Sequence, residues 1–336
     1  MVSEKPNPAI LNARSNQVFQ AMAMLAGMQL DIFTALDDGP LDEVAIAQKL
    51  EVDQSRLGRL LHALVGIELL TVENGLFANS PIADQFLVRG KPRFMGSVHE
   101  LWSDLWSATL NTAESVRAGE PKARHDFEKM TRDDMSTFLR GLHAGAVAAG
   151  KVLAAEFDLQ NCNHLLDVGG GSGGLAIGAC EAMPELRATV AEFAQVAPIT
   201  SEFITDAGMV DRIDVVEADL TQQVVTGTFD VAILRHLLQT LSADQARSVI
   251  NNVSKAITPG GQIHILGWML EDSRLAPTAA LNFDIVFLNV YDEGAAYSIG
   301  EQCAWLEAAG FSDFQFGPAP AGSVPPGCMF ISARKD

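Results

Sequence analysis

The sequence predicts an α/β protein built around a parallel sheet that holds a nucleotide-like ligand. A short apolar stretch at residues 164–168 contains Asp167 and runs directly into the glycine-rich segment GGGSGG at residues 169–174. A helical pattern begins immediately afterwards, at Leu175. A strand, a tight glycine turn and a helix in this order are typical of a nucleotide-binding α/β unit. Glycine suits the turn because it adopts positive φ and lets a ligand approach the backbone.

Four further strands are expected after this turn, and acids end two of them. Their expected ranges are 187–192, 213–220, 229–235 and 262–267. Glu192 lies 192 − 167 = 25 residues after Asp167, where an acid at the end of the adjacent strand can accept hydrogen bonds from both hydroxyls of a ribose. Asp219 and Leu220, after the next strand, are placed to contact an adenine ring.

Length and composition narrow the class of protein. At 336 residues the chain should form two domains, and 48% hydrophobic residues are enough for substantial cores. The formal net charge of −19 disfavours binding to nucleic acid or to an anionic membrane, because both carry negative charge. The sequence has no long apolar run and no signal-peptide pattern, and its four cysteines lack metal-ligand spacing. We therefore expect a cytoplasmic protein without a bound metal.

The N-terminal part of the chain predicts a helical domain. Apolar residues recur with helical spacing between residues 7 and 36. Two shorter helices are expected at 41–50 and 53–64, the second capped by Asp53. The Asn-Gly pair at 74–75 predicts the tip of a hairpin. Two helices followed by a hairpin form a winged helix-turn-helix.

A winged helix also suggests a DNA-binding regulator. Its second helix carries Arg56 and Arg59, but the helix before it carries Asp42 and Glu43. So acidic a chain is unsuited to a phosphate backbone. The apolar helices at the N-terminus favour a homodimer interface instead.

The order of these motifs resembles a known family. DVGGGSGG at the first strand, an acid ending the second, EADL after the third and PGG before the fifth are similar to class I S-adenosylmethionine (SAM) methyltransferases. The chain resembles in particular the small-molecule O-methyltransferases that include the plant caffeate and animal hydroxyindole enzymes. The resemblance implies a helical winged-helix dimerisation domain at residues 1–118 and a Rossmann-like SAM domain with acceptor-pocket helices at 119–336. An NAD-dependent enzyme is the weaker alternative, because the glycine run lacks the dinucleotide spacing.

The resemblance also implies which residues bind SAM and a small-molecule acceptor. The expected cofactor residues, at strand ends or in the glycine turn, are Asp167, Gly169, Gly171, Glu192, Asp219, Leu220 and Arg235. In the family, the long helical stretch that ends near Phe157 caps the acceptor pocket. The residues expected to contact the acceptor are Phe138, Arg140, Leu142, His143 and Asn289. Candidate cations for an acceptor carboxylate are Arg140, His143 and Arg274.

The general base of the family is missing. O-Methylating members carry a His after the fourth strand and two acids later in the chain, and a His held by carboxylates helps to remove the proton of the acceptor. Here these positions hold Gln239, Gly267 and Ala296, none of which is basic. His236 is the alternative base if the alignment is shifted by one residue, but a helical step of three residues would turn it away.

A site without a base suits an acceptor that has no proton to lose. A thioether sulfur becomes a sulfonium as it accepts a methyl, so positive charge passes from one sulfur to another. Positioning and exclusion of water then supply most of the rate acceleration. Gln239 would orient such an acceptor, and Tyr291 and Tyr297, the two tyrosines of the chain, would favour the new positive charge.

Three segments resemble a bacterial branch of the family that S-methylates 4-methylthio-2-hydroxybutyrate in dimethylsulfoniopropionate biosynthesis. They are residues 270–275, 287–292 and 296–298. O- or C-methylation of a phenolic, carotenoid or tetrapyrrole acceptor is the alternative, because carotenoid and bacteriochlorophyll enzymes of the family also lack the His. A catalytically inactive SAM-binding protein and a winged-helix regulator are alternatives of another class.

Overall fold

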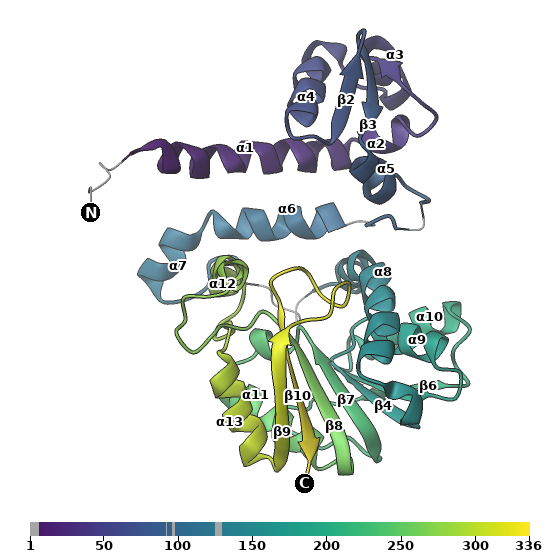
Figure 1. Cartoon of the computed structure of the whole chain (residues 1–336), viewed down its shortest axis with the longest axis vertical. Coiled ribbons are helices and arrows are strands. Elements are labelled where there is room, and N and C mark those ends of the chain that lie inside the picture. The colour runs from purple at the N-terminus through teal and green to yellow at the C-terminus, as the bar shows by residue number, and fades with distance from the viewer. Residues whose placement is uncertain (1–6, 92, 96–97, 125–129) are drawn as a thin grey trace. The chain divides into compact units, whose positions relative to one another are not determined.

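The computed structural model describes residues 7–91, 93–95, 98–124 and 130–336. The chain divides into two compact units, Met1–Ser103 and Asp104–Asp336, each described by itself (Figure 1). Helix α6 (Val98–Thr109) spans this division in the sequence. The domain boundary expected between residues 118 and 119 lies after α7 (Thr112–Ala118) and stays a prediction.

The first unit is mostly helical. The apolar spacing near the N-terminus forms a long helix and a short one, and shorter elements follow in the expected order. These elements are α1 (Ala9–Gln29), α2 (Ile32–Ala35), β1 (Leu41–Asp42), α3 (Glu43–Leu50), α4 (Gln54–Gly66), β2 (Leu70–Glu73), β3 (Leu76–Asn79) and α5 (Pro81–Leu87). The three strands pair in the order β1-β3-β2.

Two local predictions in this unit are confirmed. Asp53 caps α4, since its carboxylate accepts a hydrogen bond from the backbone N–H of Ser55 at 2.8 Å. Asn74 and Gly75 both take positive φ at the tip of the β2–β3 hairpin. The description of these elements as a winged helix stays an interpretation.

A seven-stranded sheet forms the centre of the second unit, in the order β6-β5-β4-β7-β8-β10-β9. Its strands are β4 (His164–Val168), β5 (Arg187–Glu192), β6 (Ile213–Glu217), β7 (Phe229–Arg235), β8 (Ile257–Gly267), β9 (Phe311–Pro318) and β10 (Met329–Lys335). The first five are parallel, and β10 runs antiparallel to both of its neighbours. The expected five strands are confirmed, whereas β9 and β10 were not anticipated. Because β4 lies between β5 and β7, its following loop sits where the strand order reverses, the usual ligand site of such sheets.

Helices cover both faces of this sheet (Figure 1). On one face α8 (Arg132–Glu156), α9 (Gly174–Ala182) and α10 (Ala197–Asp206) share a hydrophobic core with the strands. On the other face α11 (Ala243–Ser254) and α13 (Ile299–Ala308) do the same. The predicted Rossmann-like class I fold with an N-terminal helical domain is therefore confirmed.

Helices α8 and α9 pack closely because glycines face the partner helix. A Cβ added at Gly178 would overlap the carbonyl oxygen of Val147, and one at Gly150 would overlap the carbonyl oxygen of Leu175. These contacts fix α8 against the helix that follows the glycine turn.

Within the described ranges, several features are absent. No helix there is long and apolar enough to cross a membrane. No three His, Cys, Asp or Glu side chains of those residues gather as metal ligands do. The thiols are free at Cys162, Cys180, Cys303 and Cys328.

Replacing Gly178 with alanine should destabilise the second unit. The added methyl would force α8 and α9 apart, which should lower the free energy of unfolding by about 3 kcal/mol. The matched control is Gly145→Ala in α8, because nothing lies within 4 Å of the Cβ position of Gly145. That variant should be more stable by about 0.5–1 kcal/mol. Urea unfolding followed by circular dichroism measures both changes, and a Gly178→Ala variant as stable as the wild type would contradict the close packing.

Candidate functional site

The glycine turn between β4 and α9 is the centre of the candidate site. Gly169, Gly171 and Gly173 have φ values of +64°, +59° and +69°, which residues with a Cβ rarely adopt. The turn also has no room for a side chain at Gly170, because a Cβ there would overlap the carboxylate of Asp167. Conformation and space therefore both explain why the turn is made of glycine.

Two neighbouring elements hold this turn through side chains. Glu192, at the end of β5, accepts hydrogen bonds from the backbone N–H groups of Gly171 at 2.7 Å and Phe193 at 3.0 Å. Thr200 of α10 is fully buried and donates to the carbonyl oxygen of Gly171 at 2.6 Å. The sequence alone does not indicate Thr200, because no motif links a threonine on a helix to a turn far before it in the chain.

Asp167 and Glu192 are buried acids, only 1% and 8% exposed. Burial raises the pKa of Asp167 to about 7, although the backbone N–H of Ala176 opposes the shift. Burial also raises the pKa of Glu192. Carboxylates that are costly to ionise favour a cationic ligand, which would restore their charged forms. The turn and its acids therefore fit SAM, whose sulfonium and ammonium groups are positive.

The two residues expected at the adenine have other contacts. The carboxylate of Asp219 accepts hydrogen bonds from Thr221 and from the Gln222 side chain, so it stabilises its own turn. A contact between Asp219 and adenine stays a prediction. Leu220 is 6% exposed and belongs to the hydrophobic core. A contact between Leu220 and adenine likewise stays a prediction.

Arg235 ends β7 close to the acids. Its Nε donates to the carbonyl oxygen of Ser323, at 2.8 Å, in the loop between β9 and β10. Burial lowers the pKa of this guanidinium, and the nearby carboxylate of Asp167 acts in the opposite direction. Arg235 thus places a cation at the sheet edge where the cofactor is expected.

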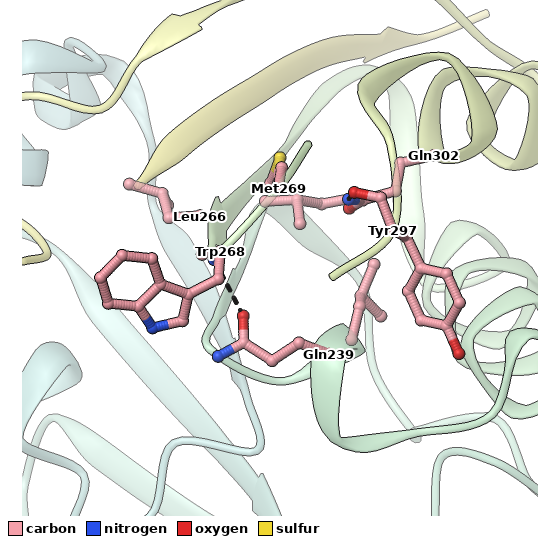
Figure 2. A pocket seen from close by; sticks show the side chains of 9 residues that line it. Gln239, Leu266, Trp268, Met269, Tyr297 and Gln302 are labelled. Atoms are coloured by element: carbon pink, nitrogen blue, oxygen red, sulfur yellow. Dashed lines mark hydrogen bonds between the residues drawn. The ribbon is translucent and has the colours of Figure 1, made fainter. Parts of the chain in front are cut away.

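Gln239 lies in a short 3-10 turn, η2 (Leu238–Thr240), beside the end of β8 (Figure 2). Its Oε1 accepts a hydrogen bond from the backbone N–H of Trp268 at 3.0 Å. A Cβ at Gly267 would overlap that oxygen, so the missing side chain there makes room for the amide. Gln239 and Gly267, two of the three positions predicted to lack a base, are therefore in contact. The small pocket beside them is lined by Leu238, Gln239, Ile265, Leu266, Gly267, Trp268, Met269, Tyr297 and Gln302.

His236 also reaches this place, contrary to the expectation that it would be turned away. Its φ is +59°, so the chain leaves β7 through a left-handed residue and not through a helix. As a result its Nδ1 lies 3.3 Å from Nε2 of Gln239. Burial, and then the positive charge of Arg235, lowers the pKa of His236 to about 3. A group with that pKa is a weak base at neutral pH, so His236 serves the Gln239 amide as an acceptor.

Ala296, the third non-basic position, lies beside an acid that the sequence alone does not indicate. Its backbone N–H donates to Oδ1 of Asp284, at 2.7 Å, on α12 (Thr278–Val290). Asp284 is half-buried, and burial raises the pKa of its carboxyl. No motif marks this residue, because its place depends on how α12 packs against the segment that contains Ala296.

Two of the three cations expected at an acceptor carboxylate, Arg140 and Arg274, bond to other side chains in the structure. Arg140 is exposed on α8 and donates to the hydroxyls of Ser136 and Thr137 in its own helix. Arg274 forms an ion pair with Glu301 at 2.7 Å. Binding of an acceptor carboxylate by either arginine stays a prediction.

Asn289 has a structural role. Its amide donates to the Thr112 hydroxyl at 2.9 Å and to the Ile285 carbonyl at 2.8 Å, and it accepts from the Ser115 hydroxyl at 2.8 Å. The residue is fully buried. One N–H and the side-chain oxygen join α12 to α7, and the other N–H bonds within α12, so these polar atoms are engaged and contact of Asn289 with an acceptor stays a prediction.

The remaining α8 residues face different ways. Phe138 packs beside Met135 and Leu139 in a small hydrophobic cluster, and Leu142 is exposed. His143 points toward the cofactor turn, where its Nδ1 lies 2.8 Å from the hydroxyl oxygen of Ser172. Contact of Phe138 or Leu142 with an acceptor stays a prediction, whereas His143 lies at the expected cofactor site.

The two tyrosines also differ. Tyr297 lines the pocket near Gln239, but its hydroxyl donates to the carbonyl oxygen of Leu241 at 2.6 Å, and its ring points away from the Gln239 amide (Figure 2). Tyr291 follows α12, with its ring 5.8 Å from that of Phe287. The Tyr297 hydroxyl is thus engaged within the protein, and catalytic roles for Tyr297 and Tyr291 both stay predictions.

A sheet covered on both faces, with this turn and these acids, fits a SAM-dependent methyltransferase, and comparison with known proteins shows that the chain is one. The O-methyltransferase domain family matches residues 114–312. The O-methyltransferase dimerisation domain family matches residues 15–89. The chain therefore belongs to the O-methyltransferase family.

Relatives cover nearly the whole chain. It is 28% identical to the 3-hydroxy-5-methyl-1-naphthoate 3-O-methyltransferase of Streptomyces sahachiroi over 91% of this chain and 90% of that one. It is 24% identical to the N,N-dimethyltransferase OxyT of Streptomyces rimosus over 87% of each chain. The fold is similar to that of human N-acetylserotonin methyltransferase in complex with SAM, with a TM-score of 0.84, 22% identity and coverage of 100% and 99%.

Replacing Glu192 with alanine should weaken SAM binding by about 10–100-fold, because a charged acceptor and a tie to Gly171 are both lost. Isothermal titration with SAM and with S-adenosylhomocysteine measures the change. Gln239→Ala is the control, since Gln239 bonds neither the glycine turn nor its acids, and it should bind SAM as the wild type does. Unchanged affinity in Glu192→Ala would refute the assignment of Glu192.

Proposed function

We propose that this enzyme methylates an acceptor that needs no deprotonation, and that the acceptor is the thioether sulfur of 4-methylthio-2-hydroxybutyrate, a step toward dimethylsulfoniopropionate. One observation carries the proposal. Where a base is expected, the Gln239 amide is held by the Trp268 N–H beside Gly267. The low pKa of His236 supports it, and so does the resemblance of residues 270–275, 287–292 and 296–298 to enzymes that use this acceptor.

Methyl transfer to a thioether requires no proton transfer. SAM, when bound, supplies a methyl group carried on a sulfonium. A lone pair of the acceptor sulfur forms the new S–C bond, and the electrons of the broken bond stay with the departing S-adenosylhomocysteine. One sulfonium is lost as another is made, so the protein has to orient the partners and exclude water.

Aromatic side chains line up near the proposed acceptor site. The rings of Trp268 and Phe283 are stacked with centroids 4.4 Å apart and an interplanar angle of 11°. Phe287 and Tyr291 continue this row along α12. Aromatic faces attract cations by about 0.5–2 kcal/mol, so this row suits a sulfonium product.

O-Methylation of a phenolic acceptor is the second candidate. The naphthoate enzyme among the relatives is named for such an activity. Asp284 favours this alternative, because burial raises the pKa of its carboxyl and a raised pKa makes a carboxylate a better base. The two candidates differ in whether a proton must leave the acceptor.

The acceptor and the pH dependence of turnover should distinguish the candidates. We expect mass spectrometry to detect a sulfonium product from SAM and 4-methylthio-2-hydroxybutyrate and no product from a hydroxynaphthoate.

The pH dependence of turnover gives a second test. At saturating SAM, kcat should stay nearly constant between about pH 6.5 and 9, because no acceptor proton is removed. The KM for SAM should rise as the pH falls through about 7, since Asp167 then becomes neutral and attracts the cation less. A steep rise of kcat with pH, or methylation of the phenol alone, would overturn the proposal.

Asp284→Asn tests the second candidate directly. If the acceptor is a thioether, this variant should keep kcat within about threefold of the wild type, because no base is needed. If Asp284 removes a proton, kcat should fall by about 100-fold or more. Thermal unfolding checks that the variant is folded, since the carboxylate also accepts the N–H of Ala296.

We also infer that the chain forms a homodimer through α1. Five large apolar side chains of this helix are between 41% and 70% exposed, namely Ile10, Leu11, Val18, Phe19 and Met22. An apolar surface of this extent marks an interface. Part of it lies in the residues that match the dimerisation domain, which supports the inference.

Charge on this surface should separate the subunits. Phe19→Asp combined with Met22→Asp places two carboxylates in the proposed interface, so light scattering should report the mass of one chain and not of two. Asn16→Asp, an exposed polar residue of the same helix, is the control and should remain dimeric. A double variant that stays dimeric would show that α1 is not the interface.

A further inference from the structure

A side-chain pair joins helix α8 to the cofactor turn. His143 is half-buried on α8, and its Nδ1 lies 2.8 Å from the hydroxyl oxygen of Ser172, which is buried within the turn. The imidazole also stacks on the ring of Phe203 in α10, with centroids 4.5 Å apart and an angle of 24°. Stacking fixes the plane of the ring, so the bond to Ser172 has a defined direction.

The turn needs such ties because its conformation is costly to hold. Its glycines at positive φ have more backbone freedom than other residues and lose more of it on ordering. Glu192 and Thr200 both hold Gly171, from β5 and α10. His143 holds the next residue, Ser172, from the third element packed around the turn.

Helix α8 is a suitable anchor for this bond. Gly150, within α8, packs directly on the α9 backbone, which fixes the later part of the helix. Leu139, one turn before His143, lies 3.2 Å from the Cβ position of Gly171. His143 therefore stands between a fixed helix segment and the part that touches the turn.

The imidazole suits this place better than a cation would. Burial lowers the pKa of His143, so the ring stays neutral near pH 7. A neutral ring can bond Ser172 without adding a positive charge beside a cationic ligand.

We propose that His143 is a positioning residue, which holds Ser172 and thereby keeps the glycine turn in the conformation that binds SAM. This role differs from the one that the family resemblance implies for His143, which is contact with the acceptor. The new role concerns the cofactor alone, so it does not depend on which acceptor the enzyme uses.

A double-mutant cycle tests the bond. His143→Phe keeps a ring for stacking on Phe203 but removes the nitrogen, and Ser172→Ala removes the hydroxyl. Each single variant should bind S-adenosylhomocysteine about 10-fold more weakly in isothermal titration. Because both remove the same bond, the double variant should lose little more than either single one. A double variant whose loss equals the product of the single losses would overturn the proposal, as would His143→Phe with wild-type affinity.

A rescue experiment separates positioning from general stability. His143→Asn keeps a hydrogen-bonding group near Ser172 and should recover most of the affinity that His143→Phe loses. Hydrogen exchange of the amides in residues 169–173 should be faster in His143→Phe and restored in His143→Asn. Gly145→Ala, on the same helix with open space around it, is the matched control and should change neither readout.

If His143→Asn binds as weakly as His143→Phe, or if exchange in the turn does not change, the positioning role fails. If His143→Phe does not fold, Ser172→Ala and His143→Asn still decide the question.

Discussion

The left-handed turn after β4 is the constraint on which the rest of the site depends. Ordering backbone costs about 1–2 kcal/mol per residue, and glycines lose more freedom than other residues. The turn is therefore held from outside, by Glu192 and Thr200 at Gly171 and by His143 at Ser172. Two of these ties come from β5 and the helix that follows it, and the third comes from α8, which packs on the helix after the turn.

A second arrangement places a hydrogen-bonded amide where a general base is expected. Gln239 accepts from the Trp268 N–H through its oxygen and approaches Nδ1 of His236 with its nitrogen. Gly267 leaves the space that the amide oxygen fills. An amide that is used in this way holds the end of β8 in place but takes no proton. The arrangement supports the proposed thioether acceptor, because that acceptor would need no base at Gln239.

Local signals explain how much of the structure the sequence predicts. Five strands and the glycine turn follow from apolar runs and glycines, and Asp167 and Glu192 follow because parallel strands bring their ends together. β9 and β10 lack such a clear pattern. Thr200 and Asp284 were missed because packing between distant segments places them. The bonds of Asn289 were not predicted, since a sequence does not show where a side chain points.

The bonds of Asn289 have a consequence for how such a chain can change during evolution. Thr112 and Ser115 on α7 hold its side chain, and Ala123 donates to its carbonyl oxygen at 3.1 Å. A recombination event between α7 and the sheet would leave the buried amide of Asn289 without its hydrogen-bond partners. Each group left unpaired would cost about 1–3 kcal/mol of stability. Crossovers that exchange N-terminal halves between relatives should therefore fall upstream of Thr112, so that α7 is inherited with the methyl-transferring half.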